Sequence, residues 1–478
     1  MNTIQRITKN VSLLLISQIF SYVFGFFTLM YSARYLGVDG FGTLSLAMAF
    51  TGIFSVSMDL GLNSIIIRDI AREKSITDEH IGIITFMKIV FSIITFILIF
   101  IFVNLFGYTP ETMKVIYLIA LYTVFTVFAQ LFLAVFQAHE KMEYRSVGTV
   151  LSSIFLLLGI LIAMYYNFDI IQFSSIYVVV GALFLAYSLL IFSWKFYVPS
   201  IKLDINKWIP FLKESWPFAL SGISINLYLW IDTIILSIIQ GSDAVGIYNA
   251  AYKLILILLF VTNVFYTTFF PLMSKYYISS KENLIFSFEK LFKIMMLFAI
   301  PIGVGTVFLS NKIILLIYGN QFSQATLPLQ ILIWSTVLVF ARTSAQCLLE
   351  SSNKQLVMTK IFLIATLFNI LLNILVIPKY SYLGASVITV LTDALIFGIS
   401  IIAISRIGIS IPNNFKISLL KISLASVVMG IILNYILSLN IFLIILISVL
   451  SYTILLLILK IFDKDEIYLI KSILKRKE

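Results

Sequence analysis

The chain has 478 residues, of which 61% are hydrophobic and 12% are charged, and its mean hydropathy is +1.07. Soluble domains are roughly 45–50% apolar and 25% charged, so a soluble core could not bury this much apolar surface. One cysteine and two histidines exclude a disulfide framework and leave too few ligands for a protein-made zinc site. We therefore expect no metal and no cofactor, and the net charge of +11 must be explained by where the basic residues lie.

Apolar runs of about 20 residues recur along the chain, each long enough to cross a hydrocarbon core of roughly 30 Å. The first run lacks a small-residue cleavage site and a second follows at once, so we interpret it as a membrane helix and not a signal peptide. The sequence predicts an all-α integral membrane protein with about fourteen transmembrane helices. In chain order they are expected at about 11–33, 43–66, 81–106, 114–137, 147–166, 174–194, 215–239, 247–270, 289–309, 325–348, 356–377, 383–404, 417–437 and 441–460.

Two short sequences suggest that the chain contains a repeat. Residues 37–42 (GVDGFG) and 241–246 (GSDAVG) both fit G-x-D-x-x-G, and each follows the first helix of a six-helix block. Gly and Asp also favour turns by chance, because Gly accepts positive φ and Asp caps helices. A true repeat predicts two parallel six-helix lobes, related by a pseudo-two-fold axis along the membrane normal and able to operate by alternating access. The predicted division is 1–195, 196–405, 406–461 for two further helices, and 462–478 for a basic tail.

Lys and Arg fall almost wholly on alternate loops, which indicates that both termini are cytoplasmic. This topology accounts for the excess positive charge, so nucleic acid is excluded as a partner.

The segment from Lys460 to Glu478 alternates apolar and basic residues and is either an orientation signal or a segment that lies on an anionic leaflet. The predicted external loops are too short for a catalytic domain and no nucleotide-binding motif is found, so we expect a carrier and not an enzyme. Four basic residues are predicted on the opposite side of the membrane from the termini, namely Arg34, Lys114, Lys312 and Lys379.

Six ionisable residues lie inside predicted helices. Each would cost roughly 2.5–3.5 kcal/mol at the centre of a membrane if it were left unpaired. Their predicted depths match for two pairs on neighbouring helices, which favours two ion pairs. The alternative is that the same charges line a cleft and bind a diphosphate, a sugar carboxylate or a coupling cation. The candidates are Asp59 with Lys88, Asp232 with Lys253, and Arg342 and Asp393.

Arg342 and Asp393 are predicted at different depths, so the sequence gives Arg342 no obvious partner. An arginine offers two parallel donors to a phosphate, which makes Arg342 a candidate for binding the substrate from the cytoplasmic side. The alternative is that its side chain extends to the cytoplasmic headgroups.

Several stretches resemble the polysaccharide-transporter family, the Wzx-type flippases. Residues 34–37, 41–42, 59–62 and 68–72 resemble the opening of that family, and residues 318–322, 369, 373, 377–378 and 384–386 resemble its later helices. The resemblance implies the multidrug/oligosaccharidyl-lipid/polysaccharide exporter fold in the plasma membrane. It also implies that a polyprenyl-diphosphate-linked oligosaccharide is flipped from the cytoplasmic to the outer leaflet.

The expected partners are the polyprenyl-linked glycan and membrane lipids, with a coupling ion and glycan-assembly enzymes as further candidates. Three cations and three anions at membrane depth nearly cancel, whereas a diphosphate site would carry surplus positive charge. A cation-coupled multidrug exporter on the same fold is therefore the alternative. A membrane glycosyltransferase would need a paired-carboxylate motif on a usable loop, and we find none that convinces.

Overall fold

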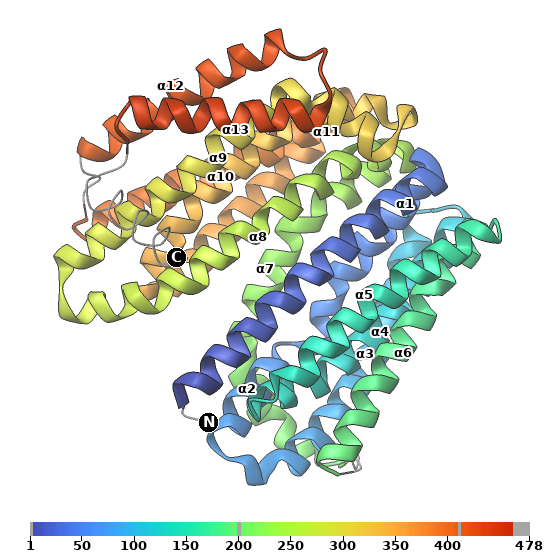
Figure 1. Cartoon of the computed structure of the whole chain (residues 1–478). Coiled ribbons are helices and arrows are strands. Elements are labelled where there is room, and N and C mark those ends of the chain that lie inside the picture. The colour runs from blue at the N-terminus through green and yellow to red at the C-terminus, as the bar shows by residue number, and fades with distance from the viewer. Residues whose placement is uncertain (1–2, 198–201, 410–412, 462–478) are drawn as a thin grey trace. The chain divides into compact units, whose positions relative to one another are not determined.

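The computed structural model describes residues 3–197, 202–409 and 413–461. Within these ranges it contains helices and no strand, so the predicted all-α class is confirmed (Figure 1). Short 3₁₀ turns join some of the helices. The α-helices are α1 (Thr3–Asp59), α2 (Leu62–Arg72), α3 (Thr77–Leu105), α4 (Pro110–Ala138), α5 (Met142–Tyr165), α6 (Ile170–Lys195), α7 (Trp208–Gln240), α8 (Ser242–Ser279), α9 (Lys281–Tyr318), α10 (Thr326–Ser351), α11 (Gln355–Arg406), α12 (Asn413–Tyr435) and α13 (Ile441–Ile458).

Twelve segments in the described chain are long and apolar enough to cross a membrane. Two of them, in α1 and α11, are bent at an internal residue with non-helical dihedral angles, Gly37 and Ser381 respectively. Each of these two segments holds two crossings, so twelve segments give the fourteen crossings that the sequence predicts.

Helix α1 is divided at Gly37 into two halves, which pack against different helices. Asn10 Nδ2 donates to the backbone oxygen of Glu140 before α5, and Tyr35 OH donates to that of Phe168 after it. The first half of α1 therefore lies along the whole of α5. The dihedral angles of Gly37 are φ 70° and ψ −173°, which a side chain would resist. Contacts from residue 42 onward bring the second half back along α7.

The two halves of α11 form a similar hairpin. Ser400 Oγ lies 3.9 Å from Met358 Sδ, and Asn369 Nδ2 donates to Thr392 Oγ1 over 3.3 Å. The pair closer to the bend at Ser381 is Asn369–Thr392, and the pair farther from it is Met358–Ser400. The two halves of α11 are therefore antiparallel.

Two helices extend further than the sequence predicts. The hydropathy pattern predicts a loop at about 271–288, yet α8 continues to Ser279 and α9 starts at Lys281. The reversal is confined to Ser280, whose Oγ accepts a hydrogen bond from the backbone N–H of Asn283. Hydropathy marks only the part of a helix that contacts lipid, and a helix can continue into water beyond it.

The chain forms two compact units. Of the described residues, those within 1–249 and 373–382 form unit 1, and those within 250–372 and 383–461 form unit 2. The boundaries fall inside α8 and α11. The two lobes at 1–195 and 196–405 and the two further helices at 406–461 are predicted from the repeat and stay a prediction. The predicted tail, 462–478, lies outside the described residues.

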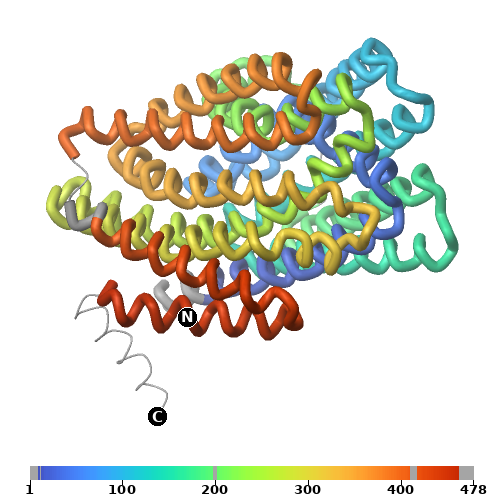
Figure 2. Tube along the Cα trace, turned by 90° about the horizontal axis from the view of Figure 1, so that it is seen from above, coloured from blue at the N-terminus to red at the C-terminus, as the bar shows by residue number. Residues whose placement is uncertain are grey.

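In unit 1, α1 packs against α5, α4 and α7, and α4 packs against α6. A cluster of buried residues fills the space between α2, α3, α4 and α6, including Ile66, Met87 and Phe136. In unit 2, α9 packs against α10 and α12, and α12 lies beside α13 (Figures 1 and 2). Large apolar side chains remain exposed on α13, among them Phe442 and Leu450, as expected for a helix that faces lipid.

Candidate functional site

Asp59 and Lys88 form the predicted ion pair in unit 1. Lys88 Nζ lies 2.6 Å from Asp59 Oδ1, and it also donates to Asn63 Oδ1 over 3.0 Å and to the backbone oxygen of Val127 over 3.5 Å. The two partners differ in exposure, because the Lys88 side chain is 0% exposed and that of Asp59 is 25% exposed. The ammonium is enclosed by acceptors, whereas one side of the carboxylate remains open.

The position of Asp59 in its helix corrects the sequence prediction. The helix expected at 43–66 ends at Asp59, and α2 starts at Leu62. The break lies at Leu60 and Gly61, which both have positive φ (44° and 79°). A glycine is needed at 61, because a Cβ there would lie 2.7 Å from Phe218 Cβ on α7. The hydropathy pattern predicts one continuous helix here, because the residues on both sides of the break are apolar. Asp59 is therefore at a helix end and not seven residues inside one.

The open side of Asp59 faces a cavity of about 420 Å³ in unit 1. Its walls come from the end of α1, the start of α2, and the middle parts of α4 and α7. Most of the lining side chains are polar although they lie on membrane helices. The lining residues are Ser55, Val56, Asp59, Gly61, Asn63, Ser64, Tyr122, Thr123, Thr126, Val127, Gln130, Phe218, Gly222 and Asn226.

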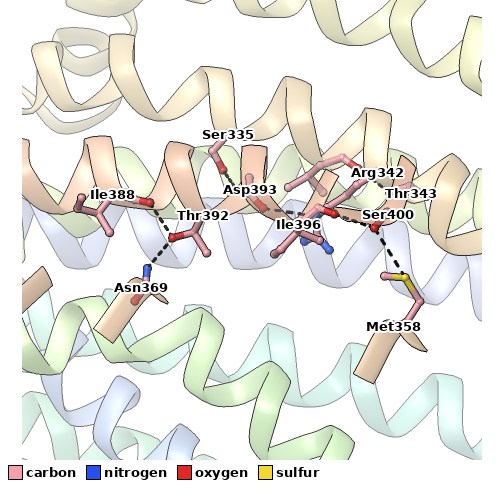
Figure 3. Close-up of polar contacts among 11 residues, drawn as sticks. Ser335, Arg342, Thr343, Met358, Asn369, Ile388, Thr392, Asp393, Ile396 and Ser400 are labelled. Atoms are coloured by element: carbon pink, nitrogen blue, oxygen red, sulfur yellow. Dashed lines mark hydrogen bonds and ion pairs between the residues drawn. The ribbon is translucent and has the colours of Figure 1, made fainter. Parts of the chain in front are cut away.

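In unit 2, Arg342 and Asp393 form an ion pair, which corrects the expectation that Arg342 has no obvious partner. Arg342 Nε lies 3.4 Å from Asp393 Oδ1, and Ser335 Oγ donates to Asp393 Oδ2 over 2.5 Å (Figure 3). Side chains on a helix lean toward its N-terminus, so Arg342 reaches back along α10 to the level of Asp393. The predicted depths were those of the backbone positions, so they did not include the length of the Arg342 side chain.

Both members of this second pair are buried. The Asp393 side chain is 0% exposed and that of Arg342 is 9% exposed, which excludes the alternative that Arg342 extends to the headgroups. The Arg342 guanidinium also lies 5.2 Å from the centre of the Phe362 ring, within the range of a cation–π contact. These contacts fit a role for Arg342 in holding α10 and α11 together.

Asp232 also lies in a hydrogen-bonded site. Asn373 Nδ2 donates to its Oδ1 over 2.7 Å, and Tyr248 OH donates to its Oδ2 over 3.0 Å. The predicted pairing of Asp232 with Lys253 stays a prediction. Sequence reasoning did not predict either neutral partner of this carboxylate, although Asn373 is one of the residues that carry the family resemblance.

The two G-x-D-x-x-G sequences adopt the same backbone. Gly241 has φ 84° and ψ −176°, close to the 70° and −173° of Gly37. Each glycine thus starts an equivalent reversal after the first helix of its block. Gly319, which lies outside the two sequences, has similar angles (φ 87° and ψ 180°), so the support for a repeat comes from the equivalent positions of Gly37 and Gly241 in their blocks.

The two sequences also contact each other reciprocally. A Cβ on Gly42 would lie 1.9 Å from the backbone oxygen of Ser242, and a Cβ on Gly246 would lie 2.1 Å from that of Val38. The sixth residue of each copy therefore packs on the second residue of the other. Two copies related by a two-fold axis produce this pattern.

Unit 2 contains two cavities along α9, α12 and α13. One, of about 680 Å³, is almost wholly apolar and is lined by residues that include Pro301, Met429 and Tyr452. The other, of about 420 Å³, lies on neighbouring turns of the same helices and is rich in lysine. Its charged residues are Glu289, Lys290, Lys293, Lys421 and Lys460.

Arg68, in the stretch that carries the family resemblance, joins α2 to α7. It hydrogen-bonds Asp69 Oδ1 over 2.7 Å and also Glu214. These two carboxylates raise the pKa of Arg68 above its usual value, because they stabilise the charged guanidinium. Arg68 therefore holds α2 against α7, two of the helices that line the polar cavity.

Fourteen crossings with an internal repeat and polar sites among membrane helices define a multi-pass membrane transporter. The sequence profile of the family described as "Polysaccharide biosynthesis protein" matches residues 7–277, more than half of the chain. The chain belongs to this family, which agrees with the resemblance seen in the sequence. A second profile, MatE, matches residues 217–375.

Similar proteins support the same assignment. The chain is 26% identical to "Capsular polysaccharide biosynthesis protein CapF" of Staphylococcus aureus, over 79% of this chain and 94% of that protein. It is 24% identical to "Probable low-salt glycan biosynthesis flippase Agl15" of Haloferax volcanii, over 80% of each. In structure it is similar to "Lipid II flippase MurJ, inward closed conformation", with a TM-score of 0.76, 18% identity, and coverage of 92% of this chain and 97% of that chain.

Proposed function

We propose that this protein flips a polyprenyl-diphosphate-linked oligosaccharide from the cytoplasmic to the outer leaflet of the plasma membrane, for the assembly of a surface polysaccharide. The observation that carries the proposal is that polar, lysine-rich and apolar cavities all occur on membrane helices of this one chain. Such a substrate has a hydrated glycan, an anionic diphosphate and a long hydrocarbon chain. The polar cavity of unit 1 and the lysine-rich and apolar cavities of unit 2 each suit one of these parts.

The relatives support this substrate class. Two of the similar proteins are named as flippases, and one as a capsular polysaccharide biosynthesis protein. A flippase transfers no chemical group, so the proposed activity is transport and not enzymatic catalysis. The repeat in α1, α7 and α8 supports alternating access, since two related halves can exchange equivalent conformations.

A cation-coupled multidrug exporter is the second candidate. The match of the MatE profile to residues 217–375 favours it, and so do the buried carboxylates Asp232 and Asp393. The two functions differ in the molecule that accumulates when the protein is lost. A flippase mutant retains lipid-linked oligosaccharide in the cytoplasmic leaflet, whereas an exporter mutant retains lipophilic cations.

The test is deletion of the gene in its host. The expected result is loss of the surface glycan together with accumulation of its polyprenyl-diphosphate-linked precursor, and reintroduction of the gene should reverse both. An unchanged surface glycan with increased sensitivity to lipophilic cations would reject the flippase in favour of the exporter.

The direction of transport requires the proposed topology, with both termini in the cytoplasm. Asp243→Cys places an exposed thiol beside the second G-x-D-x-x-G reversal, which is predicted to be external. The native Cys347 is buried and should give little background. An impermeant thiol reagent should label the variant on intact cells. Labelling only after permeabilisation would contradict the topology.

A further inference from the structure

The polar cavity of unit 1 carries a charge pattern that points to one part of the proposed substrate. Among the described residues that line it, Asp59 is the only one with a charged side chain. The neighbouring cation, Lys88, is fully buried behind the carboxylate and is already held by Asp59, Asn63 and Val127. A diphosphate would therefore meet a carboxylate and no available cation, which is unfavourable at membrane depth.

The neutral groups of the cavity provide both donors and acceptors. Asn63 uses its oxygen to bind Lys88, and Asn226 uses one N–H to bind the backbone oxygen of Gly222 over 3.0 Å, so each amide keeps further capacity. The side chains of Gln130 and Ser64 have no hydrogen-bond partner among the described residues. Hydroxyl groups of a sugar both donate and accept, and a mixed set of amides, hydroxyls and one carboxylate matches them.

Two aromatic side chains complete the lining. Tyr122 on α4 and Phe218 on α7 both contribute to the cavity wall, and Phe218 is 46% exposed. The C–H faces of sugar rings are apolar and pack on aromatic rings. The volume of about 420 Å³ falls within the range of roughly 300–1,000 Å³ for small-molecule sites, which gives room for a short saccharide.

We propose that this cavity binds the glycan of the transported lipid, as a site for neutral, polyhydroxylated sugar units that excludes the diphosphate. The inference rests on the proposed flippase function and adds a specific place for one end of the substrate. The substrate specificity of this protein would then depend on the side chains of α2, α4 and α7 around Asp59, and not on the buried ion pair of unit 2.

The test uses the full-length protein in lipid nanodiscs and three probes. The first is the glycan released by mild acid from the lipid-linked precursor of the host, the second is polyprenyl diphosphate without sugar, and the third is tetraphenylphosphonium. Asn226→Leu and Gln130→Met remove hydrogen-bonding groups at nearly constant volume. Asn104→Leu is the matched control, because Asn104 Nδ2 also donates to a backbone oxygen four residues earlier but lies outside the cavity.

Each cavity variant should weaken binding of the released glycan about tenfold, as expected when a hydrogen bond of about 1.4 kcal/mol is lost. Binding of polyprenyl diphosphate should stay within about twofold, and the control should change neither. The inference is overturned if the wild type fails to bind the released glycan, if both variants bind it normally, or if they lose polyprenyl diphosphate instead. If the protein binds tetraphenylphosphonium but neither the released glycan nor polyprenyl diphosphate, the proposed flippase function is rejected. This inference is then rejected with it.

Discussion

The two ion pairs among the membrane helices have similar composition but different surroundings. In unit 1, Lys88 is fully buried while Asp59 opens to a polar cavity. In unit 2, both Arg342 and Asp393 are buried, and Ser335 occupies the second carboxylate oxygen. The first pair therefore has a carboxylate that is open to a cavity, whereas both members of the second pair are enclosed.

This difference shows that a charge in a membrane helix does not by itself mark a binding site. Such a charge must be paired or must face water, and pairing alone meets the energetic requirement. The two pairs differ in that Asp59 keeps a solvent-accessible side and Asp393 does not. Substitutions can test whether the two pairs differ in this way.

The largest effect is expected in unit 2. Arg342→Met removes the cation and leaves Asp393 as a buried charge, which should cost about 3–5 kcal/mol. We expect low membrane abundance and a lower thermal midpoint in detergent, and adding Asp393→Asn to the same chain should recover much of the loss. Normal abundance and midpoint with abolished glycan flipping would instead assign Arg342 to the substrate path and remove the contrast between the pairs.

A smaller and asymmetric effect is expected in unit 1. Asp59→Asn leaves a buried ammonium with only neutral acceptors, at a cost of about 2–3 kcal/mol. Lys88→Met leaves a carboxylate that the cavity can hydrate, so its cost should be nearer about 1 kcal/mol. The thermal midpoints of the two variants measure the difference between their losses of stability. Equal losses would mean that the exposed side of Asp59 is not hydrated.

The smallest effect concerns the neutral partners. Ser335→Ala removes one hydrogen bond to Asp393 and should destabilise by about 1–2 kcal/mol, since the carboxylate oxygen is left buried. Asn63→Ala removes an acceptor from Lys88, but water in the cavity can replace it, so the loss should be below about 1 kcal/mol. The comparison of the two midpoints is the measurement. A larger loss for Asn63→Ala would reverse the expected order.

Much of the fold could be predicted from the sequence because lipid imposes a simple pattern on it. Apolar runs predicted fourteen crossings, and the reversals at Gly37 and Gly241 were recognised from their glycines. The break at Gly61 was missed, since the residues on both sides are apolar and hydropathy does not detect a turn within an apolar run.

The site was less predictable because hydrophobic patterns do not report the direction of a side chain. Matching depths predicted the Asp59–Lys88 pair, but the same reasoning separated Arg342 from Asp393 because it ignored the length and tilt of an arginine side chain. Asn63, Gln130 and Asn226 were missed as lining residues, since single amides in apolar helices give no pattern. The structure shows that they line the same cavity, although they lie on three different helices, α2, α4 and α7.

The reciprocal packing of Gly42 and Gly246 has a consequence for the origin of the chain. In a symmetric homodimer the same patch meets itself, so one substitution changes two contacts at once. The contact between the two G-x-D-x-x-G copies has this form within a single chain, with each glycine accommodating the backbone of the other copy. A single ancestral glycine on a self-pairing six-helix subunit would have relieved both clashes together. In this single chain the two positions are separate genetic sites, so each must be kept small independently.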